Sequence, residues 1–337
     1  MIRVCCFLTT TTSVAFHAPP RPQKLPPLRA TKPDQRLATL VSVPVVWGTY
    51  APIVRYVYEV PAPPPPLLFS AAYYVVALAT LSTAASLTRR HPGEDADRAG
   101  AELGGYLFLG NFAQVLGLQS TTANAAAFLV QLTTIFVPAL QAITSGSLQA
   151  RTRDACALAF AGVAVICGDD LDDLARTGLG DALVVLAALF YSCHVLRLGT
   201  FAPRFDPIEL ALSKAKFETL FAVVAVVVAV ALAPRDDYRA FLSADRPSTD
   251  LLKLGAATLW CGAMTCAYTI WAQSYGQFDI SPARANLVYT SQPIFSSLFA
   301  ALLVGERPTL ATLAGGTLIL LAVLVELDAF QRTPPSS

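Results

Sequence analysis

The chain has 337 residues, of which 54% are hydrophobic and only 14% are charged. Soluble domains carry roughly 25% charged residues, so this composition excludes a water-soluble globular protein. The formal net charge of +1 gives no basic surplus to attract phosphates, which argues against nucleic acid as a partner. What remains is a protein that resides in a lipid bilayer.

Residues 1 to about 36 differ from the rest of the chain. They are basic, with Asp34 as their one acid, and contain Thr-rich and Pro-rich patches. This profile is typical of an organelle-targeting presequence or of a disordered tail. Residues 13–19 (SVAFHAP) resemble the junction of bipartite plastid presequences in algae with secondary plastids. The resemblance implies a plastid envelope, with another cellular membrane as the alternative.

Ten apolar segments come after it. One membrane span needs about 20 apolar residues, and the run from Leu103 to Ala150, which contains no Asp, Glu, Lys or Arg, is long enough for two. We place the segments at 38–58, 67–88, 102–119, 122–145, 153–168, 178–199, 208–233, 252–275, 282–304 and 309–328. Between them we expect a stiff turn at Pro61 to Pro66 and charged loops at Arg89 to Arg98 and Arg235 to Lys253. After the last segment we expect a disordered tail over 329–337.

The two halves of the chain resemble each other. One constant shift of the sequence against itself aligns residues 113–117 (AQVLG) with 272–276 (AQSYG), and an acidic hinge (Asp169, Asp170, Asp172, Asp173) separates five segments from five more. Five is an odd number, so the second copy would enter the membrane from the opposite side, as in many secondary transporters. The predicted fold is an all-α polytopic membrane protein with ten transmembrane helices, arranged as two inverted five-helix repeats at 38–168 and 178–328.

Several motifs resemble those of one transporter group. Trp47-Gly48, the stretch 120–138, and the stretch 281–308 with Pro293 in mid-helix and Gly305-Glu306 at the helix end are similar to the EamA branch of the drug/metabolite transporter superfamily, over about residues 38–328. The resemblance implies a carrier of small metabolites and a structural role for Gly305 and Glu306. Tyr73-Tyr74 stands where many members carry an arginine.

Polar side chains inside a lipid bilayer cost free energy, so they are candidates for a functional role. Polar residues at helical spacing form one stripe along the fourth segment, which ends at Pro138, and another along the ninth, which ends at Ser297. Aromatic residues form one face of the eighth segment from Trp260 to Tyr275. Bonding between helices is the alternative role for these groups. The predicted substrate-binding residues are Trp47, Tyr50, Asn111, Gln114, Asn124, Gln131, Thr134, Tyr191, His194, Tyr268, Trp271, Gln273, Asn286, Thr290 and Pro293.

Few ionisable groups lie in the predicted spans. Lys214 and Glu218 are four residues apart near the start of the seventh segment, where we expect them to pair at the membrane interface. His194 is the one histidine in a predicted span, and a structural hydrogen bond is its alternative role.

No enzyme motif is found. The three histidines cannot supply the His boxes of a membrane oxygenase, and neither HExxH nor a phosphate-binding glycine loop occurs. We read five cysteines as small buried thiols (Cys156, Cys167, Cys193, Cys261, Cys266). The sequence predicts a non-enzymatic carrier without metal or cofactor that moves a small polar or amphipathic metabolite by alternating access. A channel or a membrane scaffold is the alternative, and a homodimer is left open.

Overall fold

The computed structural model describes residues 33–121, 123–146, 148–166, 178–232, 236–303, 305 and 308–332. Within these ranges the regular secondary structure is helical and no strand occurs, which confirms the all-α class. The N-terminal segment up to residue 32, the acidic hinge, Glu306 and the tail from residue 333 lie outside the described residues.

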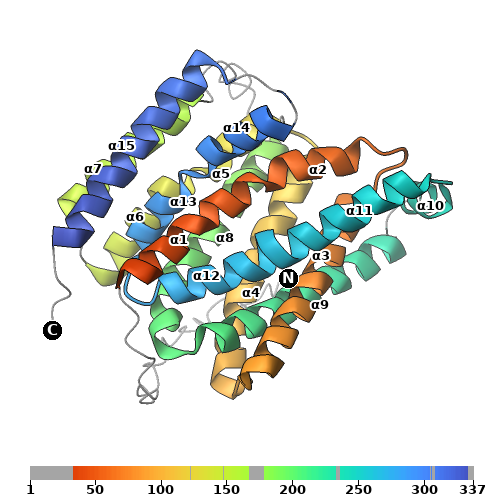
Figure 1. The fold of residues 1–337 in the computed structure, drawn as a ribbon, viewed down its shortest axis with the longest axis horizontal. Coiled ribbons are helices and arrows are strands. Elements are labelled where there is room, and N and C mark those ends of the chain that lie inside the picture. The colour runs from red at the N-terminus through yellow and green to blue at the C-terminus, as the bar shows by residue number, and fades with distance from the viewer. Residues whose placement is uncertain are drawn as a thin grey trace, which may run out of the picture.

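Each of the ten predicted segments holds one helix or a set of helices joined end to end (Figure 1). The elements are α1 (Pro33–Gly48), α2 (Tyr50–Tyr58), α3 (Pro66–Thr88), α4 (Glu94–Gly117), α5 (Ala123–Val130), α6 (Thr133–Ser145), α7 (Ala150–Ile166), α8 (Leu179–Phe201), the 3₁₀-helix η2 (Ala202–Arg204), α9 (Pro207–Leu232), α10 (Asp236–Ser243), α11 (Ser248–Trp260), the π-helix η3 (Cys261–Tyr268), α12 (Thr269–Gly276), α13 (Pro282–Tyr289), α14 (Gln292–Leu303) and α15 (Leu310–Arg332).

Some helical stretches are long and apolar enough to cross a membrane by length and composition. Among the described residues there are five: Gln35–Tyr58, Pro66–Thr88, Ala125–Ser145, Leu179–Arg204 and Pro207–Leu232, with Leu310–Glu326 as a shorter apolar helix. The first and third of these combine two helices each, so a break in the helix does not prevent a segment from having the length of a span.

Both ends of the predicted membrane region are extended by helix. α1 begins at Pro33 and not at residue 38, so Arg36, expected in the N-terminal tail, is a buried helical residue. α15 continues to Arg332 and takes in the first residues of the expected C-terminal tail. The hydropathy pattern missed these turns because they carry charged and polar residues that the apolar segments do not.

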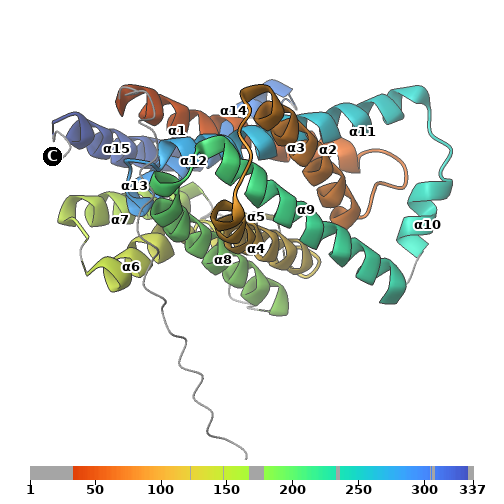
Figure 2. The ribbon, with the colours of Figure 1, turned by 90° about the horizontal axis from the view of Figure 1, so that it is seen from below.

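Two predicted loops are partly helical. α4 begins at Glu94, inside the expected loop Arg89 to Arg98, with acids in its first turn; negative charge there interacts favourably with the positive end of the helix dipole. The long connection after α9 contains α10, and α11 begins within it at Ser248. Figure 2 shows α10 at the end of the molecule opposite α7 and α15.

The ninth segment is broken where a mid-helix proline was expected. α13 ends at Tyr289 and α14 begins at Gln292, so Pro293 lies in the first turn of α14 and not in the middle of a helix. Proline is tolerated in a first turn because its missing N–H would have no helical partner there. The fourth segment is broken in the same way between Val130 and Thr133.

The expected aromatic face of the eighth segment is interrupted. The π-helix η3 lies within it and its i→i+5 bonding changes the angular spacing of the side chains. The indole Nε1 of Trp260 donates to Thr49 Oγ1 at 2.9 Å, whereas Trp271 contacts Tyr268 and Tyr275 at ring-centroid distances of 5.8 and 5.5 Å. The aromatic contacts are thus continuous only from Tyr268 onward.

Close helix packing depends on small residues. α4 packs against both α8 and α9, α3 packs against α9, and α7 packs against α15. A Cβ atom at Gly104 would lie 2.7 Å from the Lys214 carbonyl oxygen of α9, and one at Gly162 would lie 2.6 Å from the Gly315 carbonyl oxygen of α15. Glycine therefore sets how near α9 comes to α4, and with it the position of the polar residues of α9.

Candidate functional site

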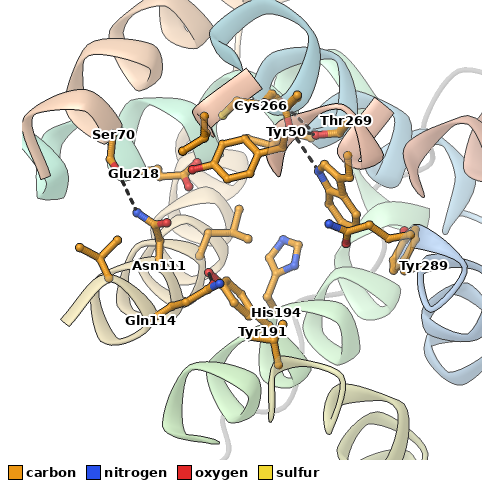
Figure 3. A pocket seen from close by; sticks show the side chains of 18 of the residues that line it. Tyr50, Ser70, Asn111, Gln114, Tyr191, His194, Glu218, Cys266, Thr269 and Tyr289 are labelled. Atoms are coloured by element: carbon orange, nitrogen blue, oxygen red, sulfur yellow. Dashed lines mark hydrogen bonds between the residues drawn. The ribbon is translucent and has the colours of Figure 1, made fainter. Parts of the chain in front are cut away.

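A cavity of about 560 Å³ lies between the helices, within the usual range for small-molecule sites. Its wall is built from the α1–α2 junction, α3, α4, the α5–α6 break, α8, α9, η3 with α12, and the α13–α14 break. No described residue of α7 or α15 lines it. Both halves of the chain thus contribute side chains to one cavity (Figure 3).

Most of the predicted substrate-binding residues line this cavity. They are Trp47, Tyr50, Asn111, Gln114, Gln131, Tyr191, His194, Gln273, Asn286 and Thr290. Their spacing in the sequence gave their helix faces correctly, and the structure brings them together from separate segments of both halves.

The other predicted residues lie elsewhere. Thr134 is buried, with its Oγ1 2.9 Å from Thr290 Oγ1, and the Tyr268 hydroxyl is 2.7 Å from the Ser42 hydroxyl. Trp271 and Pro293 are not among the lining residues. The side chain of Asn124 lies outside the described residues. Thr134 and Tyr268 therefore make contacts from one helix to another of the kind given as the alternative role.

Several polar groups of the wall are fixed by hydrogen bonds. The Tyr191 hydroxyl donates to Gln114 Oε1 at 2.9 Å, and the Trp47 indole Nε1 donates to the Thr265 carbonyl at 3.2 Å. Figure 3 shows Tyr191 and Gln114 on one side of the cavity and Tyr50 with Glu218 on another. These hydrogen bonds hold the aromatic rings in place, and some polar atoms of the wall are left without a hydrogen bond within the described part of the chain.

Three buried polar atoms of the lining residues have no hydrogen-bond partner among the described residues: His194 Nε2, Glu218 Oε2 and Asn286 Nδ2. The side chains are 2%, 4% and 3% exposed. A buried polar atom without a partner is destabilising, so each marks a place where a polar ligand or water would be stabilised.

Glu218 is the main residue that the sequence prediction misplaced. It lines the cavity, while Lys214 is 0% exposed and its Nζ donates to the Ile270 carbonyl at 3.3 Å. No ion pair within 4.0 Å joins the two in the described structure. α9 starts at Pro207, which places Glu218 about three helical turns inside it, roughly 16 Å along the axis and about half of a hydrocarbon core. The sequence position of Glu218, well inside an apolar segment, indicates this depth, and the sequence prediction did not use it.

Further aromatic and polar lining residues were also missed. They are Tyr58, Phe69, Ser70, Tyr73, Tyr74, Gln119, Thr265, Thr269, Tyr289 and Gln292. Tyr73 and Tyr74 occupy the place where family resemblance had led us to note an absent arginine, so aromatic rings stand there in place of a fixed positive charge.

The cavity reaches the helix ends on one side of the molecule. Tyr58 at the end of α2, Pro66 at the start of α3 and Gln119 after α4 all line the cavity. At the opposite helix ends, ion pairs join elements distant in sequence: Arg36 with Asp279, Arg197 Nη2 with Glu102 Oε2 at 2.9 Å, Lys216 with Asp97 at 3.3 Å and Arg90 with Asp206 at 3.7 Å. This end is therefore held together by charge pairs, and the cavity extends toward the other.

Comparisons with known proteins show which protein family this chain is similar to. Residues 178–327, which run from the start of α8 into α15, match the model of the EamA-like transporter family. The chain is also similar to two uncharacterized transporters of Archaeoglobus fulgidus. One is 28% identical over 214 residues, 62% of this chain and 68% of the relative; the other is 23% identical over 227 residues, 67% of each. Over residues 178–327 the chain is EamA-like.

The fold of this EamA-like chain also occurs in a solved structure. A crystal structure described only as that of a protein aligns with a TM-score of 0.71 and 17% identity, covering 89% of this chain and 98% of the other. The family resemblance found in the sequence is confirmed by the family match and the relatives. The protein is an integral membrane transporter, and the two relatives are named as transporters.

Proposed function

We propose that this EamA-like transporter is a secondary carrier that moves a small polar or amphipathic metabolite by alternating access. The observation that carries the proposal is the single cavity to which both halves of the chain contribute polar and aromatic side chains. Inverted-repeat carriers bind their substrates between the two repeats, near the midplane.

The helix boundaries support the repeat at 38–168 and 178–328. The fourth segment breaks between Val130 and Thr133, and the ninth breaks between Tyr289 and Gln292, at the position that the shift of the sequence repeat predicts. α4 and α12 end at Gly117 and Gly276, which the same shift relates. Breaks at matching positions are expected when two copies of one helical unit keep a shared geometry.

The first two helices of the two halves are related by a smaller shift in residue number than the later helices are. α3 begins at Pro66 and α9 at Pro207, which are closer in sequence than Gly117 and Gly276 are. The offset then grows because the second half contains a longer connection, including α10, between its second and third helices.

Corresponding residues of the two halves meet in the cavity. With the smaller offset for the first two helices and the larger one for the later helices, Tyr50 corresponds to Tyr191, Gln114 to Gln273 and Gln131 to Thr290. All six line the cavity, which supports an inverted five-plus-five arrangement of ten spans.

The ion pairs at one end of the bundle favour a carrier over a channel. A channel must be open at both ends at once, whereas a carrier is closed at one end in each of its states. Arg36–Asp279 and Arg197–Glu102 join helices at the end away from Tyr58 and Gln119. A membrane scaffold would need neither a polar cavity nor matched lining residues.

The test is transport by purified protein in proteoliposomes supplied with a panel of labelled metabolites. We expect saturable uptake of at least one solute, and its loss in the double variant Gln114→Ala/Gln273→Ala. The matched control is Thr83→Ala/Thr317→Ala, because both hydroxyls are exposed and bond only to carbonyls of their own helices. Ion flux with no saturable solute would establish a channel and overturn the carrier.

The proposed plastid location rests on the junction-like residues 13–19. A fusion of residues 1–40 to a fluorescent protein, expressed in an alga with secondary plastids, should label the plastid. Secretion of the fusion to the cell surface would contradict this location without affecting the proposed carrier mechanism.

A further inference from the structure

The cavity contains one acidic side chain. Among the described residues that line it, Glu218 is the one carboxylate, and no Asp, Lys or Arg joins it. The other polar groups of the wall are amides, hydroxyls, a thiol, the indole N–H of Trp47 and the imidazole of His194. The acidic chemistry of the wall is therefore concentrated at a single point.

The Glu218 carboxylate is buried but incompletely bonded. The residue is 4% exposed, and its Oε2 atom has no hydrogen-bond partner among the described residues. A buried carboxylate without a partner is strongly destabilising, and ionisable groups inside membrane proteins usually serve transport. The missing partner of Oε2 is thus expected to be a hydrogen-bond donor carried by a ligand.

Lys214 does not supply that partner. Its Nζ is turned to the Ile270 carbonyl at 3.3 Å, it is fully buried, and it is not a lining residue. Lys214 lies one helical turn before Glu218 on α9, and its ammonium group offsets part of the field of that carboxyl group without lining the cavity. A site with this arrangement favours a ligand with one positive charge over a ligand with two.

Aromatic rings surround the same side of the cavity. The Tyr50 and Tyr73 ring centroids are 6.3 Å apart, Tyr73 and Tyr74 are 4.6 Å apart, and Figure 3 shows Glu218 next to Tyr50. The faces of aromatic rings attract cations, because the ring quadrupole is negative there. Carboxylate and rings together select a positively charged group over a neutral hydroxyl.

The carboxylate is not a feature repeated in both halves. When α3 and α9 are aligned at Pro66 and Pro207, Ala77 occupies the position that corresponds to Glu218, and Tyr73 corresponds to Lys214. A residue needed for the general architecture of the repeat would be expected in both copies. Glu218 instead gives the shared cavity one chemically distinct side.

We propose that Glu218 binds the positive group of the transported solute, and that the solute is a monovalent organic cation: a protonated amine on an apolar body that fits about 560 Å³. The amine N–H donates to Glu218 Oε2 while the apolar body lies against the tyrosine rings. This inference rests on the proposed carrier function, whose substrate it specifies.

The test measures binding of three probes that share a phenyl ring and differ in charge: phenethylamine, 2-phenylethanol and 3-phenylpropionate. Equilibrium dialysis uses the purified full-length protein in detergent and labelled probes. We expect saturable binding of phenethylamine, about tenfold or more tighter than binding of the alcohol, and the weakest binding for the carboxylate. Equal binding of amine and alcohol, or binding of none of the three, would overturn the proposal.

Variants of α9 assign the effect to one residue. Glu218→Gln should weaken phenethylamine binding about tenfold or more and leave 2-phenylethanol binding unchanged, whereas Glu218→Asp should retain the preference for the amine. The matched control is Glu209→Gln, on the same helix but outside the cavity, which should bind both probes as the unaltered protein does. Equal losses in Glu218→Gln and Glu209→Gln would refute a specific role of Glu218.

The outcomes separate this inference from the carrier proposal. If phenethylamine binds through Glu218 but proteoliposomes show no saturable uptake or exchange of it or of any other solute in the panel, the cation site stands and the carrier fails. If the protein transports a neutral or anionic solute and Glu218→Gln transports it equally well, the carrier stands and the cation site fails.

Discussion

The two halves of the molecule agree in geometry and differ in charge. Tyr50 and Tyr191, Gln114 and Gln273, and Gln131 and Thr290 are corresponding pairs that face one cavity. In contrast, α9 carries Lys214 and Glu218 where α3 carries Tyr73 and Ala77. In the proposed carrier, the comparison means that both halves supply the shape of the cavity, while recognition of a particular solute depends on one half alone.

The largest expected effect comes from an ion pair of the second half. Arg284 Nε contacts Glu326 Oε1 at 2.5 Å, and both side chains are largely buried between α13 and α15; the first half has Ala125 in place of Arg284. Arg284→Met should cost about 3 kcal/mol of stability because it leaves a buried carboxylate without its partner. Thermal unfolding in detergent measures this loss.

A matched comparison for Arg284 is its counterpart in the first half. Ala125→Gly, at the corresponding position, removes no charge pair and should cost only about 1 kcal/mol. An equal loss of stability in both variants would show that the pair contributes nothing beyond packing.

The second effect concerns the contact between α4 and α9. Gly104→Ala should destabilise the protein by about 2 kcal/mol, since the added methyl group would press on the Lys214 carbonyl. Gly105→Ala is the control: its Cβ would meet only Phe221 at 3.7 Å, and the gain in helix propensity should stabilise by up to about 1 kcal/mol. Shifts of the same sign in the two melting temperatures would contradict the packing described for α9.

The third effect sharpens the link between the two broken segments. The Thr290 hydroxyl donates to the Asn286 carbonyl at 2.9 Å and accepts from Thr134. Thr290→Val should therefore cost about 1.5 kcal/mol, since it leaves the buried Thr134 hydroxyl without a partner, and Thr134→Val should cost less. A double-mutant cycle on unfolding free energies should give a coupling of about 0.5 kcal/mol or more; simple additivity would show that the breaks are not coupled.

The smallest effect is expected at the charged end of the bundle. Lys216 and Asp97 are 40% and 37% exposed and their charged atoms are 3.3 Å apart, and exposed pairs contribute about 0–1 kcal/mol. Lys216→Ala should leave the melting temperature nearly unchanged. A large loss there would mean that the ion pairs at this end stabilise the observed state more than their exposure suggests.

The sequence predicted the helical class, the ten helical segments and part of the polar cavity wall, because long apolar runs and regular polar spacing are determined locally. It did not predict the place of Glu218, since a Lys and a Glu four residues apart have the same spacing at an interface and in the interior. The depth of Glu218 could have been counted from the predicted start of the segment at residue 208, which is one residue from the start of α9 at Pro207.

The second offset of the repeat was missed for a related reason. The one shift that aligns residues 113–117 with 272–276 cannot align α3 with α9, because the connection that holds α10 lengthens the second half after its second helix. The interruption of the aromatic face by η3 was likewise not readable, since a π-helix has no residue signature comparable to that of proline or glycine.

The π-helix has a consequence for how α11 and α12 relate. Each extra residue held in a wider turn rotates the next part of the helix by about 100° relative to an unbroken α-helix. The directions in which side chains point around the helix axis therefore follow one series before Cys261 and a different, rotated series after Tyr268. Removing one residue from η3 would turn the Trp260 side and the Gln273 side relative to each other, so this segment determines which residues of the eighth helix share a direction.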